Sequence, residues 1–85
     1  MAAYVDDAGN LYRGKRRHHM TADSLDELHA FATSIGVKRC WYHRGTRHPH
    51  YDVTDEQQER ALAAGAESVD TRTLLTLARR LAGPR

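Results

Sequence analysis

The sequence predicts a small α/β fold, with a mainly parallel four-stranded sheet and three helices in the order β-β-α-β-α-β-α. Three segments carry apolar residues at helical spacing, and short segments rich in β-branched or aromatic residues lie between them. Such an alternation is typical of parallel sheets joined by right-handed crossovers. At 85 residues the chain has the length of one domain, and we expect that domain to span residues 1–85.

The first part of the chain predicts two strands separated by a turn and a basic loop. Residues 3–6 are extended and end in an acid, and Gly9 and Asn10 are typical turn residues. Basic residues dominate 13–17, and residues 18–22 form the second strand. The two strands fit either an antiparallel hairpin with a long loop or two parallel neighbours.

Capping residues and apolar spacing predict the three helices. Ser24 and Glu27 match a capping box at the start of a helix over residues 24–35. Thr54 is the expected cap of a second helix, which ends at Gly65. The third helix begins at Asp70 or Thr71, and its apolar stripe consists of Leu74, Leu77, Ala78 and Leu81.

Two further strands are expected, one after each of the first two helices. Residues 37–43 favour extended structure, with Cys40 as a buried small side chain. Residues 44–50 form a loop, because a proline within them disfavours helix in the residue before it. Residues 51–53 are extended and lead into Thr54, and residues 66–69 form the last strand.

Composition restricts the classes to which the protein can belong. Cys40 is the one cysteine, so a disulfide framework is excluded and a reducing, cytoplasmic location is expected. No apolar run approaches the roughly 20 residues that cross a bilayer, so we expect no membrane association. A chain of this size often gains stability from a partner subunit or a metal, so a homodimer is one expectation.

Basic residues gather in two regions of the chain. The net charge is only +2, so their distribution matters more than their number. They indicate either solvated surfaces or contacts with an anionic ligand such as a nucleotide, phosphate or nucleic acid. The candidate ligand-binding residues are Asp7, Arg16, Arg17, Arg44 and Arg47.

Histidines and aspartates follow several of the predicted strands. In open α/β sheets, ligands bind beyond the carboxyl ends of the strands, where we expect these side chains to meet. Mixed imidazole and carboxylate ligands suit a divalent ion such as Mg²⁺, Mn²⁺ or Zn²⁺, and a histidine beside a carboxylate can also transfer protons. The candidate catalytic and metal-binding residues are Asp6, His19, His50 and Asp52.

Other interpretations of these residues stay open. Asp7 and Asp52 also fit ordinary turn residues, and we interpret His29, which lies within the first helix, as structural. A zinc site is a further alternative, although its spacing is unlike that of common structural zinc sites. Its four ligands would be Cys40, His43, His48 and His50.

Five short segments occur in an order that resembles a known family. They are YVDD at 4–7, HMTAD at 19–23, ELHA at 27–30, HPHYD at 48–52 and ALAAGA at 61–66. Over about residues 2–70 the chain resembles the bacterial and phage domain-of-unknown-function family numbered four thousand and thirty-one. The resemblance implies kinship and a bacterial or phage origin, and it brings no established activity. It marks as motif positions Asp6, Asp7, His19, Asp23, Pro49, His50 and Asp52.

Three functions are consistent with these features. The first is a binding module for an anionic ligand, which uses the His/Asp residues and nearby arginines. The second is a phosphoesterase or nuclease that depends on a divalent metal. The third is a protein-interaction module, which would bind a host protein if a phage encodes it.

Overall fold

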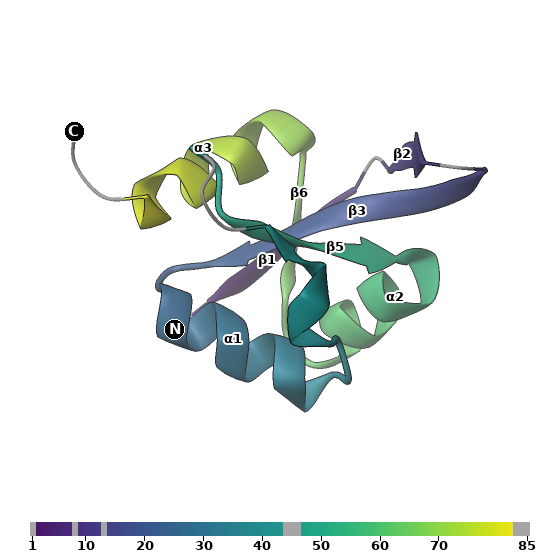
Figure 1. The fold of residues 1–85 in the computed structure, drawn as a ribbon, viewed down its shortest axis with the longest axis horizontal. Coiled ribbons are helices and arrows are strands. Elements are labelled where there is room, and N and C mark those ends of the chain that lie inside the picture. Colours follow the sequence, from purple (N-terminus) through teal and green to yellow (C-terminus); the bar gives the residue numbers. More distant parts are fainter. Residues whose placement is uncertain (1, 8, 13, 44–46, 83–85) are drawn as a thin grey trace.

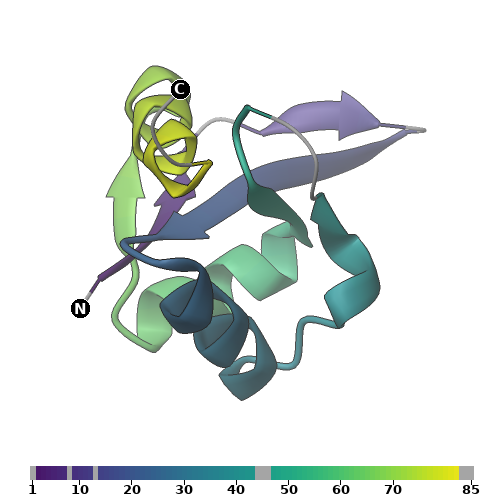
Figure 2. The ribbon, with the colours of Figure 1, turned by 60° about the vertical axis from the view of Figure 1, so that its left-hand side comes forward.

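The computed structural model describes residues 2–7, 9–12, 14–43 and 47–82, and its architecture is a mixed sheet between helices (Figure 1). Within these residues, the six strands are β1 (Ala3–Asp6), β2 (Asn10–Tyr12), β3 (Lys15–Ala22), β4 (Tyr42–His43), β5 (His50–Thr54) and β6 (Glu67–Val69). The α-helices are α1 (Leu25–Ser34), α2 (Asp55–Ala63) and α3 (Thr71–Leu81). Helices α1 and α2 cover one face of the sheet and α3 packs on the other (Figures 1 and 2).

The sheet is mainly antiparallel, so the predicted mainly parallel sheet of four strands is wrong. The strand order is β4-β5-β3-β1-β6, and β2 pairs with the outer end of β3. Among the described strands, the β1–β6 pair is parallel and the other pairs are antiparallel. The alternation of strands and helices predicted the α/β class correctly but not the strand directions, because a helix can also connect strands that end up antiparallel.

Strands β1, β2 and β3 form one long interrupted hairpin. β1 pairs with the C-terminal end of β3, from Ala3↔Ala22 to Val5↔Met20. β2 pairs with the N-terminal end of β3, from Asn10↔Arg17 to Tyr12↔Lys15. Between the two pairings the first arm has more residues than the two of β3, His18 and His19, so the hairpin carries a bulge there, which includes Asp6, Asp7 and Gly9. Residues 15–17 of the predicted basic loop instead pair with β2. Gly14, with a φ of 78°, lies in the turn between the two strands.

The helices begin and end close to their predicted limits. Ser24 caps α1 by accepting a hydrogen bond from the Glu27 backbone N–H, but the reciprocal bond of the predicted capping box does not form among the described residues. Thr54 caps α2 with a complete capping box, whose second side chain is Gln57. Asp70 caps α3, where its side chain accepts a bond from a backbone N–H in the first turn.

The predicted strand over residues 37–43 is largely wrong. A 3₁₀ helix occupies Arg39–Trp41, and only Tyr42 and His43 pair with β5. Cys40 is exposed on this short helix rather than buried in a strand. The aromatic residues that favoured extended structure instead pack beside the core, since Trp41 and Tyr42 are both half-buried.

Strand alternation divides the sheet into an apolar and a polar face. On the α1–α2 face, alternate residues of the three central strands are buried and apolar, and they pack against Leu28 and Ala32 of α1 and Ala61 of α2. The strand residues of this core are Ala3, Val5, Met20, Ala22, Tyr51 and Val53. The intervening residues of these strands face α3, and many of them are histidine, aspartate or threonine.

Candidate metal centre

Three side chains from two neighbouring strands converge on the polar face of the sheet. His19 of β3 and Asp52 of β5 are direct cross-strand partners, and His50 lies two residues from Asp52, on the same face of β5. One potential ligand atom from each of the three lies within 4.8 Å of the others. The His19 and His50 rings meet edge to face, with their centroids 4.5 Å apart.

The distances are close to those that a bound ion requires. Asp52 Oδ1 lies 3.9 Å from His19 Nε2 and 3.3 Å from His50 Nε2. An ion held at about 2.1 Å would bring its ligand atoms roughly 3.0–3.4 Å apart. The His50–Asp52 distance already lies in that range, and the His19–Asp52 distance exceeds it by about 0.5 Å.

The other polar atom of each of these side chains is held by a neighbouring group. His19 Nδ1 donates to Asp6 Oδ2 at 3.1 Å, and His50 Nδ1 donates to the His48 carbonyl at 2.5 Å. His43 Nε2 donates to Asp52 Oδ2 at 2.8 Å. Metal-binding histidines usually donate their second N–H to a carboxylate or a backbone carbonyl in this way. The three remaining atoms, two Nε2 and one Oδ1, are the ones that converge.

The two histidines differ in their readiness to carry a proton. The hydrogen bond to Asp6 raises the pKa of His19, and burial only partly opposes this effect. Burial lowers the pKa of His50, with the neighbouring His19 acting in the same direction. His50 therefore favours the neutral form that a metal needs, whereas His19 holds a proton more readily than an ordinary histidine.

Asp6 connects this cluster to both sides of the sheet. Its carboxylate is fully buried, and Oδ2 also accepts from the Thr71 hydroxyl at the start of α3, at 3.3 Å. Oδ1 lies 3.4 Å from Nδ1 of buried His18, whose Nε2 is 2.6 Å from Asp55 Oδ1 at the start of α2. Asp6, the last residue of β1, thus contacts two consecutive histidines, whose side chains leave β3 on opposite faces.

The backbone around Asp6 is fixed as firmly as its side chain. Gln58 of α2 donates from its side-chain amide to the Asp6 carbonyl at 2.8 Å, and the Asp7 N–H donates to the Val69 carbonyl at 2.8 Å. Gly9 closes the bulge, where an added Cβ would lie 2.1 Å from Cγ of Arg16. These contacts hold the backbone of Asp6 and Asp7 in place beside the cluster.

The structure brings the four predicted site residues together, although not where they were expected. Asp6, His19, His50 and Asp52 form one connected cluster. The prediction placed them at the carboxyl edge of a parallel sheet. Three of them instead lie on the face of an antiparallel pair of strands, and Asp6 reaches that face from the bulge.

The predicted ligand-binding residues are not part of this cluster. Asp7 is exposed and contributes its backbone N–H to β6, and Arg16 and Arg47 are exposed. Arg17 stacks over the Trp41 ring at 4.6 Å, and Arg44 lies outside the described residues. Among the described arginines, none forms an ion pair or hydrogen bond with the four clustered side chains.

The alternative zinc site with Cys40 does not form as a unit. Within the described part of the chain, the potential ligand atoms that converge belong to His19, His50 and Asp52, without Cys40. His43 stacks on His50 with the ring planes 13° apart, so its ring serves as a neighbour of the cluster.

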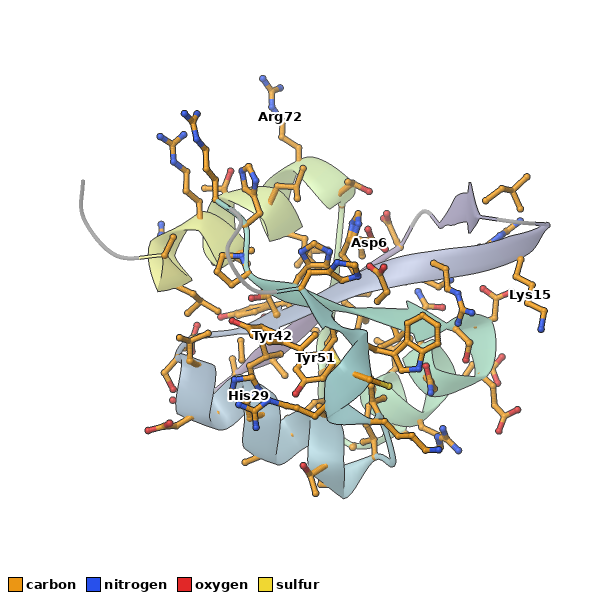
Figure 3. All side chains as sticks on the ribbon, viewed as in Figure 1. Asp6, Lys15, His29, Tyr42, Tyr51 and Arg72 are labelled. Atoms are coloured by element: carbon orange, nitrogen blue, oxygen red, sulfur yellow. The ribbon has the colours of Figure 1, made fainter. Side chains whose placement is uncertain are left out.

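His29, interpreted as structural from the sequence, lies away from the cluster on the α1 side of the sheet. Its ring packs edge to face against Tyr42 and Tyr51 (Figure 3), and burial lowers its pKa, so that it is neutral and accepts from the Tyr51 hydroxyl at 2.8 Å.

Three neighbours of the site were left out of the predicted set. His43 orients Asp52, Thr71 donates to Asp6, and His18 contacts Asp6 from the opposite face. Their contacts depend on strand register and on the bulge, which the sequence pattern alone did not define. The adjacency of two histidines in one strand was the available signal, because consecutive side chains point to opposite faces.

Comparison with known proteins identifies one family and no closer relative. A family model described as a protein of unknown function, DUF4031, matches residues 3–81. No curated protein and no solved structure matches the chain. Among the described residues, no helix is long and apolar enough to span a bilayer.

Proposed function

Because the chain belongs to the DUF4031 family, whose description states no activity, we propose a function from the site: a divalent-metal-dependent phosphoesterase or nuclease. His19, His50 and Asp52 are the proposed metal ligands. The observation that carries the proposal is that each of these side chains has its second polar atom already held, while the remaining atoms converge. Satisfied outer contacts of this kind distinguish metal sites from chance groupings of polar residues.

The donor set favours Zn²⁺ or Mn²⁺ over Mg²⁺. Two imidazole nitrogens are poor ligands for Mg²⁺, which prefers oxygen, whereas two histidines and one carboxylate are a common set in catalytic zinc sites. Three protein ligands leave at least one coordination position for water or substrate. A divalent ion in that setting lowers the pKa of a bound water and polarises a phosphoryl oxygen.

The residues around the cluster support hydrolysis of an anionic substrate. Asp6 keeps Nδ1 of His19 protonated and so directs Nε2 toward the ion. Two exposed arginines border the cluster in sequence: Arg47 lies three residues before His50, and Arg72 follows Thr71, the residue that donates to Asp6. Guanidinium groups at the edge of a metal site attract and orient phosphate groups.

The first experiment tests metal binding and hydrolysis separately. Purified protein is titrated with Zn²⁺ and Mn²⁺ by calorimetry, and the loaded protein is assayed on bis(p-nitrophenyl) phosphate and on a single-stranded oligonucleotide. We expect stoichiometric binding and metal-dependent cleavage, both lost in His50→Gln. A matched control, His29→Gln, replaces a histidine outside the cluster and should retain metal binding.

The two assays give distinguishable failures. If neither metal binds at millimolar concentration, the proposed centre is wrong. If a metal binds but neither phosphodiester is cleaved, the centre is retained and the hydrolytic function is rejected. In that case a metal-dependent module that binds an anionic ligand without cleaving it becomes the better description.

A further inference from the structure

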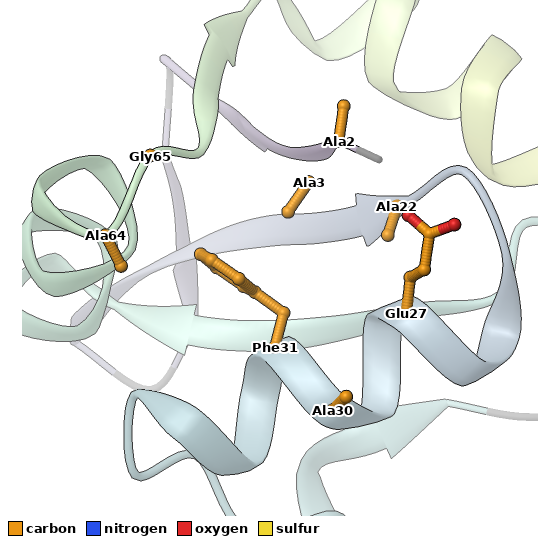
Figure 4. Close-up of a pocket in the computed structure, with 8 residues that line it drawn as sticks. All are labelled: Ala2, Ala3, Ala22, Glu27, Ala30, Phe31, Ala64 and Gly65. Atoms are coloured by element: carbon orange, nitrogen blue, oxygen red, sulfur yellow. The ribbon is translucent and has the colours of Figure 1, made fainter.

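A hollow lies on the α1–α2 side of the sheet, opposite the face that carries the proposed metal centre (Figure 4). It has a volume of about 340 Å³. Its floor consists of buried Ala3 and Ala22 of the sheet, and its walls come from α1 and from the end of the α2 segment. The remaining lining residues are Ala2, Glu27, Ala30, Phe31, Ala64 and Gly65.

The hollow has one charged end and one apolar end. Glu27 and Phe31 are one helical turn apart on α1, so they line the hollow in succession along the helix axis, about 5.4 Å apart. Figure 4 shows the Glu27 carboxylate at one end and the Phe31 ring, Ala64 and Gly65 toward the other. Small side chains on the remaining walls leave the space between them open.

The Glu27 carboxylate has an oxygen that the protein itself does not satisfy. Oε2 of Glu27 is buried and has no hydrogen-bond partner among the described residues. The capping box that would have used this carboxylate is only half formed, because Ser24 caps the Glu27 N–H without the reciprocal bond. A buried carboxylate oxygen without a donor costs free energy, and a cation beside the carboxylate would offset part of that cost.

We propose that this hollow binds a small primary alkylammonium ion. Its ammonium group would lie against the Glu27 carboxylate, and its apolar chain would lie along Phe31 toward Gly65. The charge of the carboxylate selects a cation over a neutral or anionic group, and the apolar walls select a hydrocarbon body. This site is separate from the proposed metal centre and does not depend on it.

The test uses n-hexylammonium as the probe and 1-hexanol as its uncharged equivalent. Binding to the full chain is followed by two-dimensional NMR, which also reports which backbone amides respond. We expect hexylammonium to shift the amides of α1 and of residues 64–66, and to bind about tenfold or more tightly than hexanol.

Two variants locate the site, each with a matched control. Glu27→Gln should weaken hexylammonium binding about tenfold or more and leave hexanol binding unchanged, whereas Asp26→Asn removes the same charge from an exposed neighbour and should change neither. Ala30→Leu fills the hollow from an exposed helical position and should weaken both ligands, unlike Ala63→Leu on α2.

Several results would overturn the inference. Absence of hexylammonium binding, equal binding of hexanol, or shifts confined to other surfaces would each reject it. If Glu27→Gln retains the wild-type NMR spectrum and binds hexylammonium as tightly as the wild type, the carboxylate is not the recognition group. Comparison of the variant spectra with that of the wild type guards against loss of folding as the cause.

Discussion

Asp6 makes a specific contribution to the proposed metal centre that its replacement by asparagine can measure. Asp6→Asn keeps the size of the side chain but removes the charge that faces His19 Nδ1 at 3.1 Å. Loss of such an outer carboxylate typically weakens metal binding about 10- to 100-fold. The three proposed ligands are untouched, so the variant changes the strength of the site without dismantling it.

The expected size of the effect follows from ligand linkage. For the wild type with free Zn²⁺ at 100 times its Kd, binding adds about 2.7 kcal/mol to the free energy of unfolding. A domain of this size gains roughly 4–8 °C in Tm per kcal/mol, so the wild-type shift should be roughly 10–20 °C. At the same Zn²⁺ concentration, the weakened variant should gain only about 0.4–1.4 kcal/mol.

Thermal unfolding followed by circular dichroism, with and without Zn²⁺, measures both shifts. Each protein is compared with its own metal-free Tm, so a change in intrinsic stability caused by the substitution does not enter. Asp26→Asn serves as the control for loss of one negative charge and should keep the full shift. Equal Zn²⁺-induced shifts in Asp6→Asn and the wild type would show that Asp6 does not support a metal ligand, and the reasoning would fail.

Three further predictions concern stability. The pKa of His19 is raised in the folded state. Its contribution to the free energy of unfolding is therefore fully present below the unfolded pKa of about 6.5 and is lost as the pH rises through the folded pKa. In urea unfolding, His19→Gln should lower the free energy of unfolding more in acid than at alkaline pH, and a decrease that is independent of pH would contradict this. Tyr51→Phe removes the hydroxyl that is hydrogen-bonded to His29 Nδ1 at 2.8 Å. It should lower the free energy of unfolding in urea by about 1–3 kcal/mol, and an unchanged free energy of unfolding would mean that water replaces the bond. Thr54→Ala removes the cap of α2 and should cost about 1 kcal/mol, whereas Thr54→Ser should restore most of it; an equal loss in both variants would exclude capping as the cause.

The helices were predictable because their signals are local. A cap, an apolar stripe and a terminal glycine lie within a few turns of one another, and Thr54 and Asp70 cap the helices as predicted. Strand direction depends instead on which segments meet in space. The pairing of residues 10–12 with residues 15–17 was missed, because the basic residues at 15–17 resemble those of a solvated loop.

The four predicted site residues lie together in the structure, but for a reason other than the one expected. Strand ends in a parallel sheet suggested that Asp6, His19, His50 and Asp52 would meet, whereas cross-strand pairing of His19 with Asp52 brings them together. The choice of residues did not depend on the strand directions, because imidazoles and carboxylates on the polar face of a sheet can pair in either a parallel or an antiparallel arrangement. Register, and with it the roles of His18 and His43, could not be predicted without the bulge.

The interruption of the long hairpin has a consequence for how the chain tolerates changes in length. In an ordinary hairpin the turn sets the register of the whole strand pair. Here the Asp6 carbonyl and the Asp7 N–H are anchored to α2 and β6, so the inner pairing is fixed independently of the turn at Gly14. The arm formed by β2 and residues 15–17 projects beyond the helices (Figure 1). The turn at Gly14, at the far end of this arm, can therefore be lengthened, shortened or replaced by an inserted peptide while the cluster behind the bulge keeps its geometry, which makes this turn a suitable place for attaching a probe.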